Sequence, residues 1–457
     1  LLSALLTAVG CFAKETAVLV PAYALLMELI FLHFAASNGR AARYIKLFYA
    51  IGCIVALVIC AVYFFPHYVT AQAYSARNYG AWQRIITQFR VLPTYLAWSV
   101  LPLPSHLHFY YDDYTVSSSL LHPITTLFGA LFLFGLAIFA FALRFKRPLF
   151  AFGIGWFFIA HMLTSGPLPL ELVFEHRNYP ALLGLVFACA DILKFISERW
   201  RPQIVAVLAA ILILNFGLLT AIRAATWGNP LLLAQTLVAD NPGSTRAALD
   251  LARRYVSMSG DNPDSPLYAQ GIHQLKRAAA LPNSSILPEQ ALLIQAAVHH
   301  NLATQPWWDS LQYKLSTQPM GPDNHLALYG LQQAIVHNHA SIDGQQLSKA
   351  YQIAVARNPN RLTLHAEYAE LASLALNDPL LAKPEWDRTL TLEGNSPMAA
   401  VQIIGFLIEN HRETEALNLA TYFEETRPTL RQNVPFEHLR ELAKQTANGA
   451  NSVPKTN

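Results

Sequence analysis

The chain has 457 residues, of which 53% are hydrophobic and 13% are charged, about half the charged share of an ordinary soluble domain. Its formal net charge is +3, and the basic excess lies in the apolar first half, where residues 1–222 contain 14 Lys and Arg against 8 Asp and Glu. This charge therefore argues against a nucleic-acid-binding protein and is a signal of membrane topology instead. The length allows two or more domains.

The first half predicts a bundle of membrane-spanning helices. A helix needs about 20 apolar residues to cross the bilayer core, and residues 1–13 look like the end of such a helix, so we expect the chain to be N-terminally truncated. The run at 88–103 is shorter and contains two prolines, which predicts an interfacial or re-entrant helix. Together these segments make six to seven spans and one interfacial helix. Complete spans are predicted at 16–36, 45–65, 122–143, 148–164, 179–196 and 203–222.

Lys and Arg in short connections set the expected orientation. They form three patches at alternate ends of the spans, so all three can be cytoplasmic: Arg40, Arg43 and Lys46; Arg144, Lys146 and Arg147; Lys194, Arg199 and Arg201. Residues 66–121, 165–178 and everything after Ile222 then lie outside. We expect a multi-pass protein of a bacterial inner membrane, with its C-terminal domain in the periplasm.

The first outer loop carries groups suited to phosphate or to a metal. Arg77, Arg84 and Arg90 can bind phosphate through planar, bidentate hydrogen bonds. The alternative is contact with anionic lipid headgroups. His106 and His108, followed by Asp112 and Asp113, are of metal-ligand types, and a divalent metal is the one candidate cofactor.

No fixed third ligand is visible for such an ion, so the alternative for His106, His108 and Asp112 is a set of solvated loop residues, and we assign no metal site. The four cysteines all lie in apolar runs and form no CxxC pair. They are expected to be small buried helix residues.

The second outer loop contains the sharpest cluster. Its Gly-Pro-Leu-Pro segment at 166–169 cannot be regular helix, and irregular backbone at membrane depth must be buried in protein or line a wet cavity. Glu175, His176, Arg177 and Tyr179 follow at the mouth of a span. They suit binding of a phosphate head or orientation of an acceptor hydroxyl; the alternative is an ion-pair network that fixes the bundle.

Lys14 and Glu15 separate two apolar runs. They form either a polar turn or part of a polar cavity at the outer face, and the sequence favours neither.

The second half predicts a soluble helical domain at 223–446. Stretches of helical period at 244–258, 286–301, 344–357 and 361–376 are separated by Pro, Gly and Asn breaks. This pattern favours stacked helical hairpins similar to tetratricopeptide (TPR) repeats, and the alternative is an irregular helical domain. The polar tail 447–457 is expected to be disordered.

Four stretches, taken in order, carry a family resemblance. They are Ala13-Lys14-Glu15 before an apolar helix; residues 84–96 with Pro102 and the polar loop 105–115; residues 164–184; and Arg223 to Trp227 before the repeats. The chain resembles the multi-spanning GT-C glycosyltransferase-like proteins with a C-terminal TPR domain, bacterial relatives of the transmembrane TPR-containing O-mannosyltransferases. The expected fold class is thus all-α: a GT-C-like transmembrane bundle followed by an extracytoplasmic TPR-like domain.

The resemblance implies transfer of a sugar from a polyprenyl-phosphate carrier to a protein or glycan hydroxyl, with the TPR-like domain binding the acceptor or a partner. The family's catalytic carboxylate would lie upstream of Leu1, so no catalytic residue is assigned. Arg84, Glu175, Arg177 and Tyr179 match the family as carrier-phosphate and support residues, whereas His176 and Asn178 occupy variable places. Two alternatives stay open: a non-catalytic membrane-anchored TPR scaffold for envelope assembly, and a glycan polymerase or ligase.

Overall fold

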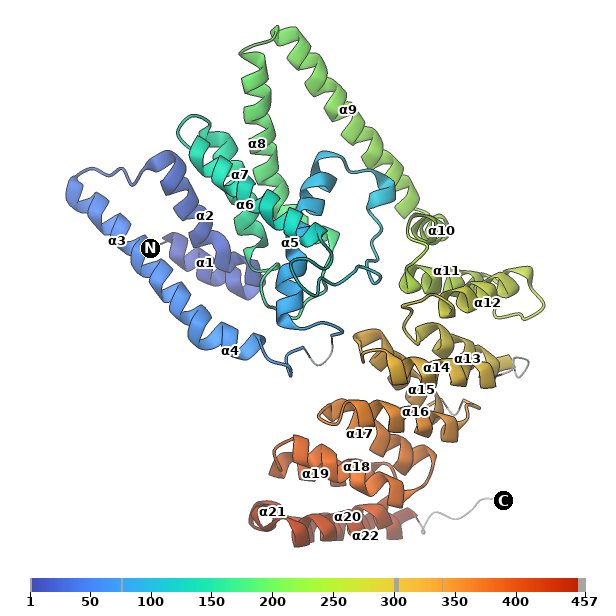
Figure 1. Ribbon diagram of the computed structural model, residues 1–457. Helices are drawn as coiled ribbons and strands as arrows, with labels where there is room; N and C mark the ends of the chain where they lie inside the picture. The colour runs from blue at the N-terminus through green and yellow to red at the C-terminus, as the bar shows by residue number, and fades with distance from the viewer. Residues whose placement is uncertain (1, 75–76, 300–303, 339, 451–457) are drawn as a thin grey trace. The chain divides into compact units, whose positions relative to one another are not determined.

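The computed structural model describes residues 2–74, 77–299, 304–338 and 340–450. All regular secondary structure in these ranges is helical, which confirms the all-α fold class (Figure 1). The chain divides into two compact units, Leu1–Arg254 and Tyr255–Asn457. The first unit continues past residue 222, the predicted end of the membrane domain, because α10 (Pro230–Asp240) and the start of α11 (Thr245–Met258) bind its loops.

Five helical segments of the described residues are long and apolar enough to cross a membrane. Each contains a predicted span or most of one. They are Glu15–Leu32, which joins η1 (Glu15–Leu19), α2 (Val20–Met27) and η2 (Glu28–Leu32); Gly39–Tyr68, which joins α3 (Gly39–Ile59), η3 (Cys60–Phe64) and α4 (Phe65–Tyr68); α6 (Thr125–Leu143); Glu175–Ser197, which joins η5 (Glu175–Asn178) and α8 (Tyr179–Ser197); and α9 (Pro202–Trp227).

Three further helices of the first unit are less apolar or shorter. The chain begins with α1 (Leu2–Ala13), and the predicted span at 148–164 is the shorter helix α7 (Pro148–Met162). The predicted interfacial segment at 88–103 belongs to α5 (Ala81–Val100), which begins earlier and keeps Pro93 inside the helix. Arg84, Thr87 and Gln88 are buried on α5, so this helix packs through polar side chains within the protein.

The three basic patches of the first unit lie at one end of its helices. Arg147, before α7, forms a 2.8 Å ion pair with Glu198, after α8. The His33 ring, after η2, lies 6.1 Å from the Phe145 ring, after α6. The turns that carry the patches are therefore neighbours, as the expected topology requires; which side of a membrane they face stays a prediction.

Helices α5 to α8 form the core of the first unit, around buried Val91, Tyr95, Leu133, Phe157 and Ala181. A close crossing joins α7 and α8, where Gly153 and Gly184 face each other. A Cβ atom on Gly153 would lie 2.2 Å from the Gly184 carbonyl oxygen. Glycine is therefore needed at this position for the two helices to approach so closely.

The second unit is a succession of short helices, stacked in layers (Figure 1). Helix α22 continues to Ala450, past residue 447, where the tail was predicted to start; residues 451–457 lie outside the described ranges. The predicted breaks at 282–283, 358–360 and 394–395 separate helices, as expected. After the end of α11 the helices are α12 (Pro266–Ala279), α13 (Leu287–His299), α14 (Gln305–Thr317), α15 (Pro322–Val336), α16 (Gly344–Arg357), α17 (Leu362–Glu370), η6 (Leu371–Ala375), α18 (Pro379–Leu392), α19 (Pro397–Glu409), α20 (Glu413–Thr426), α21 (Pro428–Asn433) and α22 (Phe436–Ala450).

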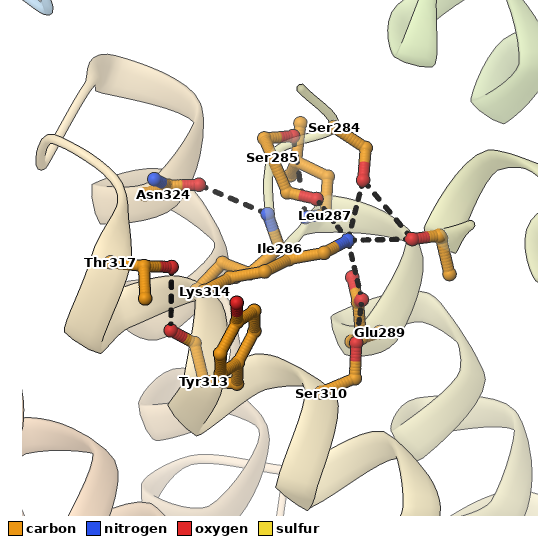
Figure 2. Close-up of polar contacts among 11 residues, drawn as sticks. Ser284, Ser285, Ile286, Leu287, Glu289, Ser310, Tyr313, Lys314, Thr317 and Asn324 are labelled. Atoms are coloured by element: carbon orange, nitrogen blue, oxygen red, sulfur yellow. Dashed lines mark hydrogen bonds and ion pairs between the residues drawn. The ribbon is translucent and has the colours of Figure 1, made fainter. Parts of the chain in front are cut away.

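A buried ion pair joins two helices of this unit (Figure 2). The Lys314 ammonium on α14 lies 2.6 Å from the Glu289 carboxylate on α13, and the Glu289 side chain has no exposed surface. Lys314 also donates to the Ala279 carbonyl at 2.8 Å and to the Ser284 hydroxyl, so it ties α14 to the turn between α12 and α13. Burying these charges is tolerable because both are paired and hydrogen-bonded.

Candidate functional site

The irregular loop after α7, residues 163–174, is held by one arginine. The guanidinium of Arg84 on α5 donates to the carbonyls of Gly166 at 3.1 Å, Leu170 at 2.7 Å and Glu171 at 2.9 Å, and also to that of Thr164. The side chain is fully buried, and burial lowers its pKa to about 10, which still leaves it charged at neutral pH. Arg84 thus supplies hydrogen bonds that a non-helical buried backbone cannot make for itself.

Three side chains of the first outer loop also support residues 163–174. The Tyr74 and Tyr79 hydroxyls donate to the carbonyls of Pro167 and Leu170, and Arg77 donates to that of Pro169. Burial raises the pKa of Tyr74 to about 12, so this hydroxyl remains a donor over the physiological range. The prediction that the Gly-Pro-Leu-Pro segment is non-helical is confirmed, and protein groups satisfy its backbone.

The second structural feature is a strap, which we define as residues 106–113 of the first outer loop. Phe109 lies in the left-handed region at φ 64°, which costs a non-glycine residue on the order of 1 kcal/mol. Its N–H donates to the Glu175 carboxylate at 3.0 Å, and the Tyr111 hydroxyl donates to the same oxygen at 2.8 Å. Glu175 therefore fixes the strained turn of the strap.

Glu175 is also paired with a cation from the end of α9. Its second oxygen lies 2.6 Å from the Arg223 guanidinium, which donates as well to the Leu107 carbonyl of the strap at 3.2 Å. Burial and the neighbouring Glu175 charge raise the pKa of Tyr111 far above its usual range. Tyr111 therefore stays a neutral donor, and Glu175 accepts bonds from three sources.

The other edge of the strap holds α10 and α11. Asp112 accepts from the Ser244 hydroxyl at 2.5 Å and from the Arg246 backbone N–H at 3.2 Å, so it caps the first turn of α11. Asp113 accepts from the Asn241 amide at 2.9 Å. The strap thus connects Glu175 to the turn between α10 and α11 and to the first turn of α11.

A pocket of about 490 Å³ lies beside Glu175. Its walls come from the end of α5, the strap, η5, the start of α8, and α9. Most of the lining residues are aromatic or aliphatic, and Ser99, Glu175, His176 and Asn178 are the polar ones: Trp98, Ser99, Pro102, Leu107, Phe109, Phe174, Glu175, His176, Asn178, Tyr179, Leu182, Phe216 and Trp227. This volume and composition are typical of small-molecule sites.

The structure brings part of the predicted site together. Glu175, His176 and Tyr179 line the pocket. Lys14, at the break between α1 and η1, is exposed, and its charge acts on His176. Glu15, the first residue of η1, is exposed and is not among the lining residues.

Other predicted residues have different surroundings. Arg77 and Arg84 hold the loop, and Arg177 donates to the Glu171 carbonyl at 2.6 Å. Their part in binding phosphate stays a prediction. His106 and His108 belong to the strap, and burial lowers the pKa of His108. Across the described ranges, no group of three His, Cys, Asp or Glu side chains is placed to hold a metal ion.

Sequence reasoning missed several site residues. Arg223 and Trp227 entered it only as the two ends of a family stretch, and Trp98 and Phe216 had no predicted role. Asn178 was taken as a variable position, yet its amide donates to the Ser99 hydroxyl at 2.6 Å and to the Tyr95 carbonyl at 3.1 Å. No protein-family model matches the chain, and no curated protein matches it either.

Proposed function

We propose that this chain is part of a membrane glycosyltransferase of GT-C type that uses a polyprenyl-phosphate-linked sugar and acts on a hydroxyl outside the cytoplasm. The observation that carries the proposal is the pocket: a mostly aromatic cavity of about 490 Å³ that is lined by residues of the membrane-length segments Glu175–Ser197 and Pro202–Trp227 and includes Glu175, the ion-pair partner of Arg223. A lipid carrier combines the same two chemistries, an isoprenoid chain and an anionic head.

The apolar part of the pocket suits the chain of such a carrier. Leu182 on α8 and Phe216 on α9 belong to its walls. Beyond the pocket both helices expose large apolar side chains, among them Val186 and Ile213. A lipid chain that leaves the pocket would therefore meet surfaces that already suit the bilayer core.

The polar side supports an anionic head and an acceptor hydroxyl. Arg223 supplies a cation next to Glu175, and the exposed Lys14 is a second cation whose charge acts on His176. A guanidinium binds phosphate oxygens well because its N–H groups form a planar fork. We do not assign Glu175 as a general base, because Arg223, Tyr111 and the Phe109 N–H already engage both its oxygens.

The stacked helices of the second unit suit the binding of an acceptor protein or a partner. In this proposal, the basic turns of the first unit face the cytoplasmic side of a bacterial inner membrane. Stacked helical hairpins offer extended surfaces for protein ligands.

The test is lipid binding with a blocked pocket. Leu182→Trp places an indole in the cavity, whereas Leu183→Trp changes the next residue of α8, which is exposed and not a lining residue. We expect Leu182→Trp to weaken binding of a polyprenyl phosphate in nanodiscs at least tenfold and Leu183→Trp to leave it unchanged. Transfer of sugar by the full-length protein should follow the same order.

Binding that both variants retain equally would refute the proposal. Tight lipid binding without transfer to any protein or glycan acceptor would favour the membrane-anchored scaffold. Transfer to glycan acceptors alone would favour the polymerase or ligase.

A further inference from the structure

Arg223 is a cation beside the pocket, and its ion-pair partner is Glu175 of the same chain. Its guanidinium contacts Glu175 at 2.6 Å and the Leu107 carbonyl at 3.2 Å, and both of these residues line the pocket. The side chain is 27% exposed, unlike the fully buried Arg84. Arg223 is not itself a lining residue, so a ligand in the pocket would reach it at the place where Glu175 now contacts it.

Glu175 opposes the binding of an anion at this point. A phosphate on Arg223 would lie next to the carboxylate, and like charges at such distances repel strongly where water is partly excluded. The Glu175 carboxylate takes on Arg223 the place that a phosphate oxygen would take. An anionic ligand must therefore compete with it.

We propose that Arg223 is the anion-binding residue of the pocket and that Glu175 competes with the anion for the Arg223 guanidinium. A lipid-linked phosphate displaces Glu175 from Arg223, and the strap moves together with Glu175. The inference rests on the proposed function, because it concerns the same pocket and the same class of ligand. The strap follows Glu175 because the Phe109 N–H and the Tyr111 hydroxyl are bonded to it. The left-handed turn at Phe109 loses its support when Glu175 moves.

Displacement of the strap reaches the turn between α10 and α11. Asp112 caps α11 through Ser244 and the Arg246 N–H, and Asp113 binds Asn241. A strap that moves with Glu175 strains or breaks these bonds. Occupation of the pocket and the hold on α10–α11 are therefore coupled, and linkage makes the coupling reciprocal: weakening that hold strengthens phosphate binding.

The first experiment compares two lipids on three proteins in phosphatidylcholine nanodiscs. We expect Glu175→Gln to bind a polyprenyl monophosphate about tenfold more tightly than wild type, because an amide does not compete for Arg223 as a carboxylate does. Binding of the uncharged polyprenol should not change, which shows that the pocket is intact. Glu198→Gln removes an ion pair of similar length at the other end of α8 and should change neither affinity.

The second experiment measures hydrogen exchange over residues 230–246. The polyprenyl monophosphate should speed exchange there by severalfold, and the polyprenol should not. The pair Asp112→Asn and Ser244→Ala, which weakens the cap of α11, should raise affinity for the phosphate severalfold by reciprocity. Inorganic phosphate, or nanodiscs of phosphatidylglycerol, should not reproduce the effect.

Three outcomes would overturn the inference alone: equal phosphate affinity in Glu175→Gln and wild type, unchanged exchange at 230–246 on binding, or the same response to inorganic phosphate or phosphatidylglycerol. If wild type binds neither lipid in the pocket, the proposed function fails as well. The two failures are thus told apart by the polyprenol and by the Leu182→Trp variant.

Discussion

Replacing Arg84 by lysine should open the loop at 163–174 while leaving the rest of the first unit folded. The guanidinium donates to four carbonyls, of Thr164, Gly166, Leu170 and Glu171. A lysine ammonium keeps the charge, but all its donors are on one nitrogen. It therefore cannot reach all four of these carbonyls at once. Losing two such bonds, at about 1.5–3 kcal/mol each, weakens the loop by roughly 3–6 kcal/mol.

Amide hydrogen exchange measures this directly. The Gly166 and Leu170 N–H groups are bonded within the loop, to the carbonyls of Leu163 and Leu168. Because each 1.4 kcal/mol is a factor of ten, their exchange should accelerate at least about 100-fold in Arg84→Lys. Arg90→Lys is the matched control on the same helix: Arg90 donates to the Thr115 carbonyl at 2.7 Å and to no part of this loop. Equal exchange in Arg84→Lys and wild type would refute the assignment of Arg84 as the residue that holds the loop.

Three further predictions concern packing and buried charges within each of the two units. Lys314→Met leaves the Glu289 carboxylate buried without its cation and should lower the unfolding free energy of the second unit by about 3–5 kcal/mol in denaturant titrations read by proteolysis. Adding Glu289→Leu should recover most of this loss, and an equally unstable double variant would contradict it. Gly153→Ala forces α7 and α8 apart and should cost about 1–3 kcal/mol in thermal unfolding in detergent, whereas Gly52→Ala, which meets nothing, should be silent. Burial raises the pKa of Glu415 above its ordinary 4.5, so the charged form opposes folding and stability falls as pH rises through that region. Glu415→Gln should therefore raise the melting temperature of the second unit at pH 7 to 8, and the gain should shrink toward pH 4.5; a gain that is independent of pH would contradict this cause.

The membrane helices could be predicted because their signal is local. A run of apolar residues marks the part of a helix that fits a bilayer core, so α3 and α9 were found from composition alone. The predicted ends of these helices lie inside the observed ends, because helical backbone hydrogen bonding continues beyond the apolar run until a cap or a break. Asn38, whose side chain accepts from the Ala41 N–H at 2.8 Å, starts α3 before the predicted residue 45.

The site could be predicted only where its residues are close in sequence. Glu175, His176 and Tyr179 fall within five residues, and the structure places all three at the pocket. Their partners come from far away: Arg223 is 48 residues from Glu175, and Tyr111 is 64 residues from it. No periodicity or local motif extends over such separations, so these contacts depend on how the helices pack.

The same limit explains the arginines. A guanidinium offers the same planar set of donors to a phosphate and to a group of backbone carbonyls, so residue type cannot tell the two ligands apart. Burial and position in the fold can tell these two ligands apart. Arg84 is fully buried among carbonyls 80 to 87 residues away in sequence, whereas Arg223 is partly exposed beside the pocket and is held by a carboxylate. An anionic ligand can exchange with a carboxylate at a pocket, but to reach Arg84 it would have to unfold the loop that forms part of the same unit. For this reason we propose Arg223, and not Arg84, as the first contact of a lipid-linked phosphate.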